Sequence, residues 1–241
     1  MPFAEDLEIY GATHLKHLID SVNESWTTAI PVQGPRPQPE FSDGFRRSAV
    51  TNEQLKNLDP PCRRFRIYLV LHGHIPDVLS FFTCEVKCGT VALDIADRQN
   101  AHSMTLAVRG VVDLYRTVKR EKELNREILA FSVSHDNRTV RIYGHYALID
   151  GDKTTIYRHL IHKFDFTALD GKEKWTAYKF TKNVYDLCMP THLKRVCSAI
   201  DDLPSDLDFD VSQQSELRFE ETPDLQLSQE VQSSQQLGAS S

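Results

Sequence analysis

The chain has 241 residues, 40% of them hydrophobic, and its 28 Lys and Arg against 34 Asp and Glu give a formal net charge of −6. This length predicts one domain with terminal segments, and the composition excludes a collagen-like, coiled-coil or wholly disordered chain. No apolar run approaches the ~18 residues needed to cross a membrane, and the N-terminus has no signal-peptide pattern, so we expect an intracellular protein, nuclear or cytoplasmic, without membrane contact.

The first thirty residues (1–30) are expected to form a helical segment, because residues 5–26 place apolar side chains at mostly helical spacing. Several prolines follow between 31 and 39 and predict an extended connector. Residues 51–58, beginning at Thr51, have the pattern of a short capped helix. The helical segment therefore precedes the main domain, which we place at 31–200.

The centre of the chain alternates strand-like and helical patterns. We predict strands at 65–71, 79–88, 127–134, 139–148 and 154–166, and helices at 92–122 and 174–200, the second interrupted at Pro190. Residues 139–148 alternate apolar and polar side chains, as a sheet with one buried face requires. The order of elements indicates an α/β or α+β fold with helices on a central sheet, and we adopt α/β.

The composition changes near residue 200. Residues 201–241 contain ten acidic residues and one basic residue, Arg218, so they carry −9 while residues 1–200 carry +3. Such a segment buries too little apolar surface to offset the entropy of ordering, and we predict a disordered acidic tail. The positive remainder does not exclude binding to nucleic acid, and the tail would compete for the same basic surface.

Five cysteines are present in an odd number and without a Cys-x-x-Cys pair, at positions 62, 84, 88, 188 and 197. This pattern predicts reduced, mostly buried thiols rather than disulfides. A zinc site formed by Cys84, Cys88 and some of the ten histidines remains an alternative, but no second ligand pair at suitable spacing supports it.

The strongest chemical signal is the triplet Glu85-Val86-Lys87 on an otherwise apolar predicted strand. Alternation along a strand places Glu85 and Lys87 on the same side, about 7 Å apart. Burying both charges is costly unless they pair or serve a function. The alternatives are a structural ion pair, or a cation ligand (Glu85) beside a lysine that positions the attacking water and stabilises phosphorane charge. The other acidic-x-Lys triplet, Asp170-Gly171-Lys172, lies at a glycine turn and indicates solvated surface.

Phe81 to Lys87, followed by a helix that carries Gln99, resembles the PD-(D/E)XK nuclease-like superfamily. The chain is similar, more specifically, to a fungal domain family of unknown function that is placed in that superfamily. The similar stretches are residues 34–49, 81–89, 94–103, 141–146, 164–167 and 175–186. The resemblance implies a nuclease-like core with a mixed central sheet flanked by helices, and a site that uses Mg²⁺.

The superfamily pattern also requires a first acidic residue on a neighbouring strand, and three residues compete for this place. Glu40 follows Pro39 and best matches the fungal family, with Asp43 as a near substitute. Asp77 follows Pro76, but in one extended strand it would lie about 26 Å from Glu85. We therefore rank the metal ligands that would join Glu85 as Glu40, then Asp43, then Asp77.

Gln99 lies where related nucleases often carry a glutamine that supports the site. The alternative for Gln99, Asn100 and His102 is an ordinary polar helix N-terminus. Asp94 and Asp97 precede that helix and most simply cap it.

Basic residues gather in two parts of the chain and suit contact with phosphates. The candidate nucleic-acid-binding residues are Arg116, Lys119, Arg120, Lys122, Lys179 and Lys182. The alternative is that both sets are solvated helix faces.

The sequence therefore predicts a Mg²⁺-dependent phosphodiester hydrolase acting on nucleic acid, with Glu85, Lys87 and Gln99 as catalytic residues and no small-molecule cofactor. Two alternatives remain: an inactive domain of the same fold that binds nucleic acid or protein, and an interaction domain whose Glu85–Lys87 pair is structural. The kind of nucleic acid and the oligomeric state are left open.

Overall fold

A computed structural model of the chain describes residues 4, 11–26, 31, 34–58, 77–88 and 92–204, and of His14, Asp77 and Val78 only the backbone. Contacts divide the chain into two units, Met1–Asp206 and Leu207–Ser241, and every described residue belongs to the first. The strand predicted at 65–71 and the tail from 205 onward lie outside the described residues.

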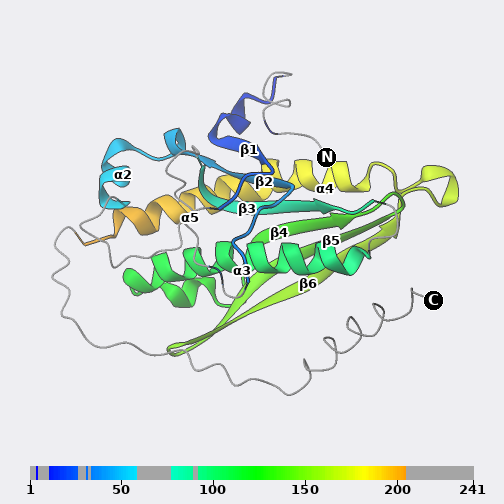
Figure 1. Cartoon of the computed structure of the whole chain (residues 1–241). Helices are drawn as coiled ribbons and strands as arrows, with labels where there is room; N and C mark the ends of the chain where they lie inside the picture. Colours follow the sequence, from blue (N-terminus) through cyan, green and yellow to red (C-terminus); the bar gives the residue numbers. More distant parts are fainter. Residues whose placement is uncertain are drawn as a thin grey trace, which may run out of the picture. The chain divides into compact units, whose positions relative to one another are not determined.

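The described residues form a mixed six-stranded sheet whose spatial order follows the chain (Figure 1). Its strands are β1 (Leu18–Val22), β2 (Phe41–Arg46), β3 (Asp77–Val86), β4 (Ile128–His135), β5 (Thr139–Asp150) and β6 (Lys153–Asp165). All neighbouring strands are antiparallel except β3 and β4, which are parallel. Parallel neighbours need a crossover, and the long helix α3 (Leu93–Thr117) provides it.

Helices cover both faces of the sheet. Helix α3 packs on the face that carries Thr83, which bonds to Asn100 of the helix. On the other face lie α4 (Thr176–Asn183), the π-helix η5 (Val184–Cys188) and α5 (Met189–Asp201), and there Phe180 of α4 meets Phe131 of β4 edge to face. The shorter helices of the described residues are η1 (Thr13–His17), η2 (Arg47–Ala49), α2 (Asn52–Leu58), η3 (Glu121–Leu124) and η4 (Leu169–Gly171). The core is built from the apolar stripe of α3, the sheet, and the inner faces of η5 and α5.

The helix predicted over residues 5–26 is wrong for residues 18–22, which form β1. Their apolar spacing fits a helix locally, but pairing with β2 buries Leu18 and Ile19 as strand residues. Strand β2 was not predicted, because Ser42-Asp43-Gly44 interrupts its apolar pattern. Ser42 and Asp43 are nevertheless buried, so tertiary contacts decide the structure here.

The two long helices differ from prediction at their ends. Helix α3 stops at Thr117, and the left-handed backbone of Lys119 (φ 58°) turns the chain into η3. The interruption predicted at Pro190 lies instead in η5, whereas Pro190 occupies the first turn of α5, where its missing N–H is not needed. No helix in the described part of the chain is both long and apolar enough to span a membrane.

The boundary predicted at residue 200 falls inside the folded unit. Helix α5 ends at Asp201, which accepts a hydrogen bond from Gln54 of α2 (2.8 Å), and Leu203 is buried. The acidic residues Asp201 and Asp202 therefore belong to the fold.

Candidate active site at the end of strand β3

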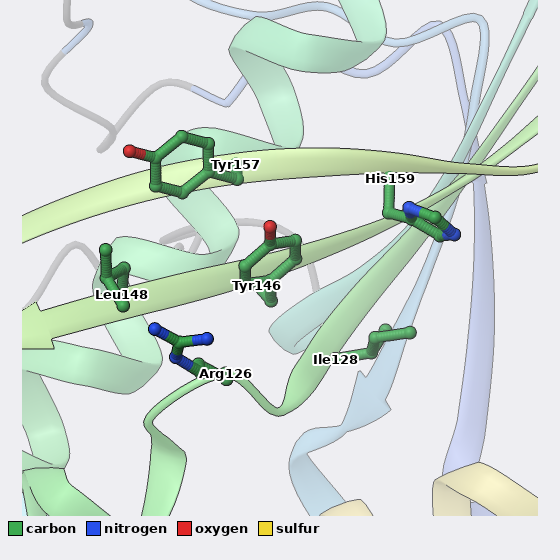
Figure 2. A pocket seen from close by; sticks show the side chains of 6 residues that line it. All are labelled: Arg126, Ile128, Tyr146, Leu148, Tyr157 and His159. Atoms are coloured by element: carbon green, nitrogen blue, oxygen red, sulfur yellow. The ribbon is translucent and has the colours of Figure 1, made fainter.

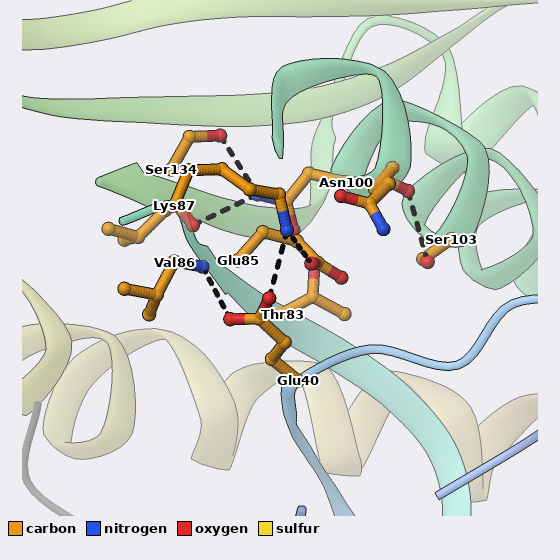
Figure 3. A network of polar contacts seen from close by, with 10 residues as sticks. Glu40, Thr83, Glu85, Val86, Lys87, Asn100, Ser103 and Ser134 are labelled. Carbon is orange, nitrogen blue, oxygen red and sulfur yellow. Dashed lines mark hydrogen bonds and ion pairs between the residues drawn. The ribbon is translucent and has the colours of Figure 1, made fainter. Parts of the chain in front are cut away.

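Two carboxylates and one ammonium group meet at the carboxyl end of β3 (Figure 3). Lys87 Nζ lies 2.9 Å from Glu40 Oε1 and 3.3 Å from Glu85 Oε2. The backbone N–H of Val86 donates to the other oxygen of Glu40 at 2.7 Å. The structure thus brings together Glu40, Glu85 and Lys87 of the predicted site residues.

Strand pairing explains this convergence. Phe41 of β2 lies opposite Cys84 of β3 in an antiparallel register, so the next pair in that register is Glu40 and Glu85. Since side chains alternate along a strand, Glu85 and Lys87 share the face that α3 covers.

The electrostatics of the site differ between its members. Burial of Glu85, which is 1% exposed, raises the pKa of its carboxyl group, and the attraction of Lys87 only partly opposes this. Burial alone lowers the pKa of Lys87, but its hydrogen bond to Glu40 and the charges of both carboxylates outweigh burial, so the pKa is raised and the side chain stays an ammonium. The Glu40 side chain is 37% exposed and opens the site to solvent.

A buried amide links the site to its surroundings. Asn100, 1% exposed on α3, accepts a hydrogen bond from Thr83 Oγ1 at 2.7 Å. Its amide nitrogen donates to the carbonyl of Val133 and to Ser134 Oγ, each at 2.9 Å. Asn100 therefore joins β3, β4 and α3 directly behind the site.

The side chain of Gln99 is exposed, whereas the neighbouring Asn100 makes these buried contacts. The backbone carbonyl of Gln99 accepts a hydrogen bond from Ser103 Oγ, as helix carbonyls commonly do. Sequence reasoning treated Asn100 only as part of a polar helix N-terminus. Asn100 could have been identified from its position seven residues after Leu93, which places it on the same helix face as the apolar stripe.

Asp43 lies on the opposite face of the sheet from Glu85. It pairs in register with Phe82, and its Oδ2 accepts a hydrogen bond from Tyr185 of η5 at 2.6 Å. Burial and the neighbouring carboxylate raise the pKa of Tyr185 well above its usual range, so the phenol remains a donor. Alternation thus separates Asp43 from the site, although it lies only three residues from Glu40.

Asp77 begins β3, opposite Arg46 of β2, while Glu85 lies near the other end of the same strand. The side chain of Asp77 is outside the described residues.

The site offers two carboxylates to a metal ion. Among the described residues, no group of three or more His, Cys, Asp or Glu side chains has the arrangement of a metal site. Mg²⁺, however, is commonly held by one or two carboxylates and keeps several waters. The raised pKa of Glu85 indicates that Lys87 does not fully compensate its charge, and a cation beside Glu40 and Glu85 would complement it. The donor set therefore fits Mg²⁺.

The thiols nearby do not suit zinc. Cys84 is buried, and burial raises its pKa to about 12, so it stays a thiol, while Cys88 is exposed at the end of β3.

Three of the predicted nucleic-acid-binding residues have partners within the fold. Arg116 donates hydrogen bonds to the β5–β6 hairpin. Arg120 forms an ion pair with Asp202, and Lys182 with Asp186.

The other three, Lys119, Lys122 and Lys179, are exposed. Lys119 and Lys122 follow α3, whereas Lys179 lies on α4, which covers the other face of the sheet. The two basic sets therefore do not line one groove beside Glu85.

A further polar cluster was missed at the start of α3. Asp97 accepts hydrogen bonds from Arg141 (2.5 Å) and from Tyr143 (3.1 Å) of β5, and Arg141 also pairs with Asp94. Arg158 of β6 donates to the backbone carbonyl of Asp97. Asp94 and Asp97 thus lie inside the helix and hold β5 and β6 against it, rather than capping it. The cluster could have been predicted from the alternation along β5, which places Arg141 and Tyr143 on one face of the strand.

Fold and site together define an α/β protein with a mixed sheet and a carboxylate–lysine site at the end of β3. The chain belongs to a domain family of unknown function, DUF7924, whose model matches residues 1–200. No curated protein and no solved structure matches the chain.

Proposed function

We propose that the protein is a metal-dependent phosphodiester hydrolase of the PD-(D/E)XK type that acts on nucleic acid inside the cell. The observation that carries this proposal is the convergence of Glu40, Glu85 and Lys87 from two neighbouring strands. A buried carboxylate with a raised pKa beside a lysine at a sheet end is the kind of perturbed pair that marks functional sites.

In this proposal Glu40 and Glu85 would hold Mg²⁺, which would supply Lewis-acid polarisation of a phosphoryl oxygen. The chain itself contributes the ammonium of Lys87, which remains charged because both carboxylates raise its pKa. From its place between the carboxylates, Nζ donates a hydrogen bond to the attacking water and stabilises negative charge on the phosphoryl group. Asn100 keeps β3 and α3 in place behind these groups.

The test is a Mg²⁺-dependent cleavage assay on plasmid and single-stranded substrates. We expect Lys87→Ala to lower the cleavage rate by about 10²–10³-fold, and chelation of Mg²⁺ to abolish cleavage. Lys172→Ala is the matched control, because Lys172 belongs to the exposed acidic-x-Lys triplet and should leave the rate unchanged. Wild-type protein that cleaves nothing, or Lys87→Ala protein that cleaves normally, would contradict the proposal.

A second candidate is a non-catalytic domain in which these residues form a structural ion pair. Both oxygens of Glu40 already accept hydrogen bonds, one from Lys87 and one from the Val86 N–H, and this favours the alternative. Nucleic-acid binding by wild type without cleavage, unchanged in Lys87→Ala, would support it.

A further inference from the structure

The face of β5 and β6 that points away from α3 carries an open hollow of about 430 Å³ (Figure 2). Tyr143 of β5 reaches Asp97 of α3, so its neighbours Gly144 and Tyr146 face the other way. The hollow is lined by Arg126, Ile128, Tyr146, Leu148, Tyr157 and His159. It lies on the opposite side of the sheet from Glu85 and Lys87.

Two tyrosines form the aromatic part of this hollow. Tyr146 and Tyr157 are paired across β5 and β6, and their rings stack with centroids 5.7 Å apart and planes inclined by 22°. Tyr157 remains 44% exposed. At Gly144 a Cβ would come within 3.0 Å of Ile128, so glycine leaves room for the Ile128 side chain that lines the hollow. The fold thus presents an aromatic surface to solvent.

Arg126 is held beside these rings by a strained backbone. Its φ of 68° is unusual for a residue other than glycine, and such strain persists only where the surroundings enforce it. The Arg126 N–H donates to the carbonyl of Ala147 at 2.8 Å, and the Ile149 N–H donates to Asn125 Oδ1 at 2.9 Å. No carboxylate in the described part of the chain forms an ion pair with Arg126, so its charge is available to an anion.

A second hollow of about 500 Å³ continues from the first, because Arg126 and Ile128 line both. Its walls include Leu187 of η5, 68% exposed, and Arg195 of α5, which forms an ion pair at 3.5 Å with Glu127, a further wall residue. Leu187 lies on a π-helix, a rare element that occurs frequently at functional sites. The two hollows make an extended track, which suits a polymer better than a small molecule.

We propose that this track binds single-stranded nucleic acid, with a base stacked on Tyr157 and a phosphate on Arg126. Exposed aromatic rings on a sheet face, flanked by arginine, are the recurring means of binding unstacked bases. Duplex DNA offers no free base faces to such a surface. The proposal does not rest on the hydrolase, since no residue of the track belongs to the site at β3.

The test is fluorescence anisotropy with a labelled single strand, as DNA and as RNA, and with the duplex of the same sequence. Wild type should prefer the single strand, and Tyr157→Leu should weaken its binding about tenfold. Tyr178→Leu is the matched control, because Tyr178 is 37% exposed on α4 outside the track, and it should bind as wild type. Arg126→Gln should lower the salt dependence of binding, the slope of log K against log[salt], by about 0.7.

Equal binding of single strand and duplex, or unchanged affinity in both Tyr157→Leu and Arg126→Gln, would overturn the proposal. So would competition by a free mononucleotide as effective as that by the oligonucleotide, since the ligand would then be a small molecule. Retained binding in Glu85→Gln protein would support it and would separate this surface from the hydrolase proposal.

Discussion

At the scale of single residues, the charge of Glu85 has opposite consequences for folding and for chemistry. Its carboxyl group is buried, and burial holds its pKa above the usual value. The folded state therefore binds a proton at Glu85 more tightly than the unfolded state does, so folding stability falls as the pH rises above the unfolded pKa near 4.5. A buried carboxyl group whose charged form is disfavoured by burial suits a site that binds a cation.

We accordingly predict that Glu85→Gln stabilises the fold at pH 7 by an amount on the order of 1 kcal/mol while it abolishes cleavage. Below the unfolded pKa both proteins are neutral at this position, so the difference should vanish near pH 4. Urea unfolding at both pH values measures this difference in unfolding free energy between Glu85→Gln and wild-type protein. If the contact between Glu85 and Lys87 is structural, Glu85→Gln should instead destabilise the fold at pH 7, although Lys87 keeps Glu40 as a partner, so the sign decides between the two candidates.

At the scale of the element, β2 and β3 create the site, and the sequence predicted only one of them. The strand that carries Glu85-Val86-Lys87 was predicted from its apolar residues and from the alternation of its side chains. β2 was hidden because its central residues are polar and are buried only through tertiary contacts. The family pattern allowed Glu40 to be ranked first among the candidate acidic residues. Its position opposite Glu85 depends on the register between β2 and β3, which could not be predicted from the sequence.

The residue of α3 that supports the site could not be predicted from the sequence either. A helix in this region was predicted from its periodic apolar residues, and α3 has that periodicity. Which of two adjacent polar residues turns inward depends on the rotation of α3 about its axis against β3 and β4. Composition does not set that rotation, so Gln99 was chosen where Asn100 is the buried residue.

Adjacent substitutions on α3 test this assignment. Asn100→Ala leaves Thr83, Val133 and Ser134 without their partner, and we expect a loss of about 1–3 kcal/mol in unfolding free energy. Gln99→Ala, at an exposed position, should change it by less than about 0.5 kcal/mol. Denaturant unfolding measures the unfolding free energies of both variants against wild-type protein. Loss of activity in Gln99→Ala without loss of stability would instead restore Gln99 as the supporting residue.

At the scale of the whole molecule, the folded unit extends past the end of the family match at residue 200. The net charge of −6 divides unevenly along the chain, and composition alone placed the boundary where acidic residues begin. Asp201 and Asp202 are acidic yet structural, because Gln54 and Arg120 bind them. A boundary drawn from charge therefore removes residues on which the last helix depends.

Two truncated chains, 1–200 and 1–206, test where the fold ends. The shorter chain lacks the Gln54–Asp201 hydrogen bond, the Arg120–Asp202 ion pair and the buried side chain of Leu203. The exposed ion pair contributes little, but the apolar burial and the hydrogen bond together correspond to about 2–4 kcal/mol. We therefore expect the 1–200 chain to melt about 5–10 °C below the 1–206 chain in thermal unfolding followed by circular dichroism. Leu203→Ala in the full chain should reproduce about half of that shift, and equal melting temperatures for the two truncated chains would place the boundary at residue 200 after all.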